Sequence, residues 1–216
     1  EQFAKAHHLD LVAFEKNQRK DDLAKEYLAR SSFTEGVLWN DRGRFLLVTD
    51  MPANIIYKLS TDGKQQSVYL DRSGYTGHDI WRVGRMQPNG VDPNAPGYVQ
   101  FALLGSNGLT FDPQGRLIIA AHGDRAIERI ERNGKRTILA DKYEGKRING
   151  PNDVIVKSDG SIWFSDPGYG ILNDYEGHKG EFELDRCNVF RLDPATGALE
   201  VVVDDFVRPR LTTGRR

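Results

Sequence analysis

The chain lacks the features that would tie it to a membrane, to nucleic acid or to disulfide bonding. Cys187 is its only cysteine, which excludes an intrachain disulfide and a CxxC metal site. No apolar run approaches the roughly 20 residues that a transmembrane helix needs. A formal net charge of −1 gives no electrostatic basis for binding nucleic acid or a charged membrane surface. We expect a soluble protein with neither partner, and its compartment, periplasmic or cytoplasmic, and its oligomeric state stay open.

Two common catalytic signatures are also missing. No Gly-x-Ser-x-Gly segment is present, so a nucleophile elbow is not arguable. The glycines at 84–90 and 105–108 do not form a phosphate loop that precedes a helix. What remains is an ordinary globular composition, with 38% hydrophobic and 28% charged residues.

The first 30 residues differ from the remainder of the chain. They combine apolar residues with many charges and contain no Gly or Pro, which predicts one or two short helices. We expect residues 1–30 to form a helical N-terminal extension that packs on the main domain. An arm that binds a partner is the alternative.

From residue 31 the pattern is that of an all-β protein. Short runs such as Phe45–Thr49 and Ile55–Leu59 are separated by turns of the Asp-Gly or Asn-Gly type. The order strand, glycine turn, strand, loop, strand, glycine turn, strand occurs three times. The first turns of these units hold Gly43, Gly115 and Gly160, and the second turns hold Gly63, Gly134 and Gly197.

Repeated four-stranded units are typical of the blades of a β-propeller. We expect about three complete blades in residues 31–209, with two long insertions, 71–105 and 167–186, that wall a pocket. A β-sandwich would not repeat the unit in this way. Residues 210–216 show no alternation and are expected to be an aberrant or unstructured tail. This tail, together with Glu1 in place of an initial Met, indicates a partial or prematurely ended chain.

Each unit carries an oxygen-bearing side chain just ahead of a strand. Equivalent positions of successive blades approach one axis, so these side chains predict a shared polar site. They are Glu35 in Thr34-Glu-Gly-Val-Leu-Trp39, Asn107 in Ser106-Asn-Gly-Leu-Thr-Phe111, and Asn152 in Asn149-Gly-Pro-Asn-Asp153.

These segments occur together with Ala121-His-Gly-Asp-Arg125 and Phe164-Ser-Asp-Pro167. In combination they resemble the SMP-30/gluconolactonase/LRE-like family, in particular its bacterial gluconolactonase branch, over about residues 31–209. Members of that family are six-bladed β-propellers that hold one divalent metal, commonly calcium, and hydrolyse lactones such as gluconolactone. The resemblance implies a hydrolase of a small-molecule sugar lactone with Ca²⁺ as cofactor, and Zn²⁺ or Mg²⁺ as alternatives.

The resemblance also assigns residues. Glu35 matches the family's first-blade metal ligand, and Asn152 matches an asparagine that faces metal or substrate at the same site. The family's next ligand is an asparagine after an Arg-Pro pair, but Arg208-Pro209 is followed here by Arg210. A later aspartate, the family's acid/base, also has no counterpart, so the catalytic residue is unknown. Since calcium takes six to eight oxygen ligands, Glu35 and Asn152 alone predict weak or no metal binding by the 216-residue chain.

Four further residues are candidates for substrate binding: Asn107, His122, Asn149 and Asp166. Each type also has a structural use, because Asn and Asp stabilise turns and a lone His is often structural. Glu35 could likewise be a solvated loop carboxylate, and Asn152 could cap a turn. The aromatic side chains expected to pack between blades are Trp39, Trp163 and Phe164.

Three functions stay open. The leading one is metal-dependent hydrolysis of a sugar lactone to its acid. The alternatives are a propeller that binds without catalysis, and a related metal-dependent arylesterase or phosphotriesterase. A panel of sugar lactones and aryl esters separates the two enzymatic functions.

Overall fold

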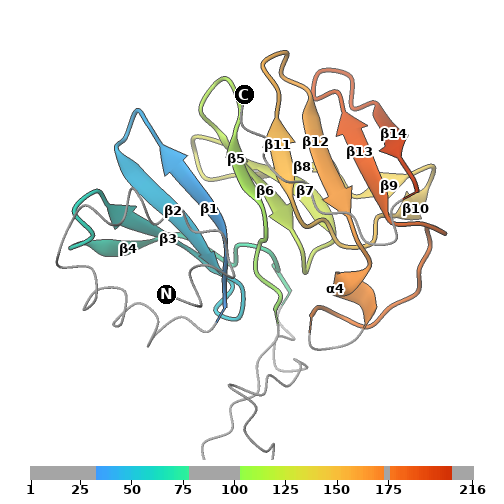
Figure 1. Cartoon of the computed structure of the whole chain (residues 1–216), viewed down its shortest axis with the longest axis horizontal. Helices are drawn as coiled ribbons and strands as arrows, with labels where there is room; N and C mark the ends of the chain where they lie inside the picture. The colour runs from blue at the N-terminus through green and yellow to red at the C-terminus, as the bar shows by residue number, and fades with distance from the viewer. Residues whose placement is uncertain (1–32, 78–102, 173–175, 206–216) are drawn as a thin grey trace, which may run out of the picture.

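The structure is a computed structural model that describes residues 33–77, 103–172 and 176–205. It is almost entirely β-structure, as the turn pattern predicts, and three four-stranded sheets lie side by side (Figure 1). The first sheet consists of β1 (Thr34–Asn40), β2 (Phe45–Asp50), β3 (Ile55–Ser60) and β4 (Gln66–Asp71). The second consists of β5 (Leu109–Phe111), β6 (Leu117–Ala121), β7 (Ala126–Ile130) and β8 (Arg136–Ala140). The third consists of β11 (Val154–Val156), β12 (Ile162–Asp166), β13 (Asn188–Leu192) and β14 (Leu199–Val203).

Two smaller elements accompany the sheets. A short ribbon pairs β9 (Lys142–Tyr143) with β10 (Lys146–Arg147), and α4 (Tyr169–Leu172) is a single helical turn within the second insertion. The helices expected in residues 1–30 and the tail expected at 210–216 lie outside the described residues.

Each large sheet is an antiparallel meander whose strand order is the chain order. The first strands of neighbouring sheets are in contact, β5 with both β1 and β11, whereas the fourth strands of the outer two sheets, β4 and β14, lie at the edges of the view (Figure 1). This is the arrangement of propeller blades, with the first strand of each blade innermost. The predicted β-propeller architecture is thereby confirmed, with three blades in the described residues.

The glycine turns form where the sequence predicts them. In the first turn of the first blade, Arg44 rather than Gly43 has the positive φ, 52°. There the amide of Gly43 donates to the Asn40 side-chain oxygen at 2.6 Å. The other turn glycines adopt positive φ, which costs glycine little; they are Gly63, Gly115, Gly134, Gly160 and Gly197.

In the described residues the core consists of two apolar layers, one on each side of the second blade. Because side chains alternate along a strand, β6 presents Leu117 and Ile119 to the first blade and Ile118 to the third. Phe164 and Phe190 stack at 5.2 Å between ring centroids in the second layer, and both are fully buried. Burying one such ring contributes roughly 2–3 kcal/mol to folding.

The predictions for the three large aromatic residues have different outcomes. Phe164 packs between blades, as expected. The prediction for Trp39 is wrong: Leu38 takes the face toward the second blade, so Trp39 points the other way and is 41% exposed. Alternation likewise turns Trp163 to the face opposite Phe164, where it is half-buried under the Lys157 ammonium.

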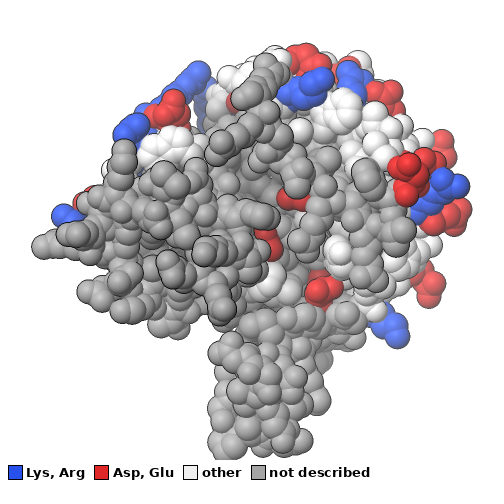
Figure 2. Space-filling model, viewed as in Figure 1, with Lys and Arg blue, Asp and Glu red and all other residues white. Residues whose placement is uncertain are grey.

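The surface carries charges of both signs. Lys and Arg side chains mix with Asp and Glu side chains along the rim of the described part of the face in Figure 2. Among the described helices, none has the length and apolar character to cross a bilayer.

Candidate functional site

The inner strands bring the three predicted polar positions to one end of the blades. Glu35 is the second residue of β1, and Asn107 and Asn152 each stand two residues before an inner strand, β5 and β11. The Gly108 amide donates to the Asn152 carbonyl oxygen at 2.6 Å, which joins the second blade to the third. The three segments therefore form one continuous inner wall.

Two glycines make this close approach of the chain segments feasible. A Cβ at Gly36, which has φ +52°, would lie 2.0 Å from the carbonyl oxygen of Asn107. A Cβ at Gly108 would lie 2.8 Å from the carbonyl oxygen of Asn152. Both distances are far below van der Waals contact, so each position requires a residue without a side chain. The Glu-Gly and Asn-Gly pairs are visible in the sequence, but a dipeptide does not reveal which neighbouring blade it touches.

The candidate metal ligands differ in exposure from the residue between them. Glu35 and Asn152 are half-buried, whereas Asn107 is 6% exposed. Beside Asn107, the hydroxyl groups of Thr49 and Ser106 lie 3.2 Å apart and connect β2 to the second inner segment. The half-buried pair is accordingly more accessible than Asn107 to a ligand at the inner wall.

Asp166 holds the turn that carries Asn152. Its carboxylate is fully buried and accepts the main-chain amides of Asn149 at 2.7 Å and Gly150 at 2.8 Å. Burial raises the pKa of Asp166 to about 7, against the opposing effects of these two amides and of Arg125. The geometry is that of a group that orders the turn from behind.

Asn149 is also enclosed by protein. Its side-chain nitrogen donates to the carbonyl oxygens of Asp166 at 3.2 Å and Arg186 at 3.1 Å. Its side-chain oxygen is buried without a hydrogen-bond partner among the described residues. The predicted contact of Asn149 with substrate stays a prediction, and this geometry favours a structural role.

His122 joins the same turn to the second insertion. Its ring is 2% exposed, with Nδ1 at 3.3 Å from the Pro151 carbonyl oxygen and Nε2 at 2.6 Å from that of Glu176. Burial lowers the pKa of His122, which favours the neutral ring. A neutral imidazole donates from one nitrogen, and the shorter distance favours Nε2. Substrate contact by His122 would require one of these contacts to break.

The described parts of both insertions lie at this end of the blades. The first insertion is anchored by Asp124, whose carboxylate accepts the Thr76 amide at 3.0 Å. The rings of Tyr75 and His178 lie 4.8 Å apart and join the first insertion to the second. That the insertions wall a pocket stays a prediction, because much of the first lies outside the described residues.

Sequence reasoning missed Arg125, although its motif was visible. Its Nε donates to the Ile148 carbonyl oxygen at 2.8 Å, and its Nη2 lies 4.0 Å from a Glu183 carboxylate oxygen. Arg125 also has a positive φ of 59°, which a non-glycine residue rarely adopts. The signal was a charged residue directly after the His-Gly-Asp sequence, but its partners lie 23 and 58 residues further along the chain.

The site offers oxygen atoms of the kind that a hard cation prefers, but it offers few of them. Glu35 offers a carboxylate and Asn152 an amide oxygen, and calcium prefers oxygen ligands of these types. The described residues contain no group of three or more His, Cys, Asp or Glu side chains that could hold a metal ion. These residues would therefore supply part of a calcium site rather than a complete ligand shell.

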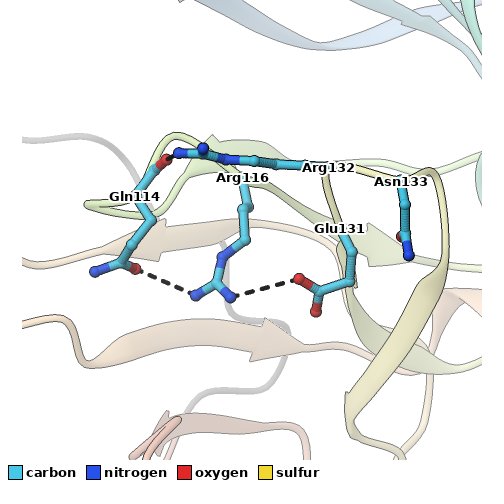
Figure 3. Close-up of a pocket in the computed structure, with 5 residues that line it drawn as sticks. All are labelled: Gln114, Arg116, Glu131, Arg132 and Asn133. Atoms are coloured by element: carbon cyan, nitrogen blue, oxygen red, sulfur yellow. Dashed lines mark hydrogen bonds and ion pairs between the residues drawn. The ribbon is translucent and has the colours of Figure 1, made fainter.

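One surface depression of the described residues, about 510 Å³, lies away from this site (Figure 3). It is formed by the β5–β6 and β7–β8 turns, at the opposite end of the second blade from Asn107. Within it Arg116 contacts Gln114 at 3.2 Å and Glu131 at 3.4 Å, so its charge is already matched by protein groups. We assign no function to this depression.

Comparison with known proteins places these features in a family. The family model of the SMP-30/gluconolactonase/LRE-like region matches residues 33–209. A gluconolactonase of Zymomonas mobilis subsp. mobilis is 34% identical over 178 residues, which cover 82% of this chain and 44% of that protein.

Solved structures agree with the sequence match. A gluconolactonase from Xanthomonas campestris has 30% identity and a TM-score of 0.63, with 81% of this chain and 48% of the other covered. A second structure, of a protein assigned to the gluconolactonases, has 34% identity and a TM-score of 0.64, with coverage of 83% and 51%. The chain thus spans about half the length of these relatives. From the matched region and the shared fold, the chain belongs to the SMP-30/gluconolactonase/LRE-like family.

Proposed function

We propose that this chain takes part in the metal-dependent hydrolysis of a sugar lactone to the corresponding acid. The observation that carries the proposal is the continuous inner wall, on which Glu35, Asn107 and Asn152 stand at one end of successive blades. Membership of the family and the likeness to gluconolactonases support the choice of a sugar lactone as substrate.

The proposed roles follow from the chemistry of the side chains. Glu35 and Asn152 would hold a divalent cation, with Ca²⁺ favoured because both are oxygen donors. When bound, such a cation polarises a lactone carbonyl and stabilises the oxyanion that forms as water attacks. Asn107 lies between the two ligands along the wall, where its amide could orient the sugar. We assign no acid/base residue within this chain.

The proposal is tested by the release of acid from gluconolactone by the chain in millimolar calcium. We expect measurable turnover that Glu35→Gln lowers by roughly 10–100-fold, the usual loss when a metal site is impaired. Glu131→Gln is the matched control, because Glu131 lies on the turn at the opposite end of the second blade. Absence of calcium-dependent turnover, or equal turnover by Glu35→Gln, would contradict the proposal.

The same assay with other substrates separates the alternatives. Turnover of aryl esters or phosphotriesters in preference to sugar lactones would indicate the related esterase function. Saturable binding of a sugar lactone without hydrolysis would indicate a propeller that binds without catalysis.

A further inference from the structure

We infer that Asp166 is a positioning residue: its carboxylate fixes the turn Asn149–Asn152 and, through that turn, the place of Asn152 on the inner wall. The role of Asn152 as a ligand rests on the proposed function. The mechanical step, from Asp166 to the turn, can be measured without any activity.

The turn depends on Asp166 because regular structure does not hold it. Residues 148–153 lie between β10 and β11 and belong to no strand. The amides of Asn149 and Gly150 are directed at the two oxygens of one carboxylate, at 2.7 and 2.8 Å. Since Asn149 is fully buried, water cannot replace Asp166 as acceptor for its amide without opening the turn.

A short chain of contacts carries this constraint to Asn152. Pro151 follows Gly150 directly and restricts the backbone between the amides that Asp166 accepts and Asn152. Asn152 then donates its amide to the Ser165 carbonyl oxygen at 3.0 Å and accepts the Gly108 amide at 2.6 Å. Consecutive residues of β12, Ser165 and Asp166, therefore hold the two ends of the turn.

The carboxylate is not a requirement of the blade fold. The second blade has Ala121 at the end of β6, the position equivalent to Asp166 at the end of β12. Yet Asn107 and Gly108 still make the corresponding main-chain bonds to β6 there, through Ala120. Asp166 is also fully buried, so it acts through the turn and not by touching substrate. The effect of its acceptor oxygens can therefore be separated from that of its bulk by a substitution that keeps its size.

The test is amide hydrogen exchange at about pH 8, where Asp166 is ionised, in wild type, Asp166→Asn and Glu128→Gln. Asparagine keeps the size of the side chain but turns an amide donor toward one of the two main-chain donors. Glu128 is a buried acid on the second blade, paired with Arg136 at 2.8 Å, and controls for a general loss of stability. We expect exchange at Asn149, Gly150 and Asn152 to be about tenfold faster or more in Asp166→Asn and unchanged relative to the core in Glu128→Gln.

Several results would overturn the inference. One is rapid exchange of the Asn149 and Gly150 amides in the wild-type chain, a measurement that needs no variant to fold. Another is equally faster amide exchange throughout the core of Asp166→Asn, which would mean that the substitution destabilises the whole protein and not the turn in particular. A third is faster exchange of the Asn149 and Gly150 amides while the exchange of the Asn152 amide and the NMR signals of its side-chain NH₂ stay unchanged.

Activity distinguishes failure of this inference from failure of the proposed function. With gluconolactone and calcium, we expect kcat/KM of Asp166→Asn to fall about tenfold while that of Glu128→Gln stays at the wild-type value. A wild-type chain without turnover would contradict the proposed function. The exchange data would then still test whether Asp166 fixes the turn. Full activity in Asp166→Asn would overturn the positioning role.

Discussion

Gly36→Ala tests the close approach of the first two blades. The new Cβ would lie 2.0 Å from the Asn107 carbonyl oxygen and 3.0 Å from the Leu109 side chain. To reach ordinary contact, β1 must retreat by roughly 1 Å or more, which opens the apolar layer that contains Leu109. Overpacking of this kind costs about 1–3 kcal/mol.

The positive φ of Gly36 adds a second destabilising effect, which a control substitution at another glycine measures separately. Gly36 has φ +52°, and an L-residue in this region loses roughly 1–2 kcal/mol. Gly134 has φ +82°, but a Cβ added there would meet no atom of the described residues within 4 Å, so Gly134→Ala carries the backbone cost alone. We expect Gly36→Ala to lower the free energy of unfolding by about 2–5 kcal/mol and Gly134→Ala by about 1–2 kcal/mol.

Urea unfolding measures both variants. The midpoint should fall further for Gly36→Ala, with the slope m unchanged if unfolding remains two-state. Equal destabilisation by the two substitutions would refute the close approach of β1 to the Asn107 segment, and with it the continuous inner wall.

Three further predictions concern the core, pH and metal. Phe164→Ala should lower the free energy of unfolding by about 3–5 kcal/mol, because Phe164 is fully buried. Trp39→Ala should lower it much less, since Trp39 is 41% exposed. Thermal or urea unfolding checks both variants. Asp166 has a pKa of about 7 in the folded chain against 3.8 as its ordinary value, so its contribution to stability is complete below pH 3.8 and is lost as pH rises through 7. The difference of 7 − 3.8 corresponds to about 4 kcal/mol, and Asp166→Asn should remove this pH dependence from the unfolding free energy; an unchanged slope would contradict the burial argument. Calorimetric titration of the 216-residue chain with calcium should give only weak binding, roughly in the millimolar range, and a micromolar affinity would contradict the small ligand count.

Local sequence predicted the strands and turns because both depend on near neighbours. Alternating residues placed Ile118 and Phe164 on opposite strand faces from their neighbours. Five of the six turn glycines took the positive φ that only glycine adopts easily, and Gly43 is the exception. The same periodicity made the facing of Trp39 predictable in principle, but its direction depends on which face of β1 meets the second blade. That is a property of the assembled sheets.

The end of the blades at which the candidate residues gather was also predictable, but the use of each side chain was not. His122 and Asp166 stand at strand ends at the correct end, yet their partners are main-chain groups 29 and 16 residues away. No local pattern specifies whether such a side chain is exposed at the inner wall or is buried against the turn behind it. Arg125 was missed for the same reason.

The central claim is that Glu35 and Asn152 act at a single site, and a double-mutant cycle tests it most directly. The measurement is kcat/KM for gluconolactone, in saturating calcium, for wild type, Glu35→Gln, Asn152→Ala and the double variant. Because residues that act as one unit are strongly non-additive, the double variant should be hardly slower than the more impaired single variant. Losses that multiply in the double variant would place the two residues at independent sites and contradict the claim.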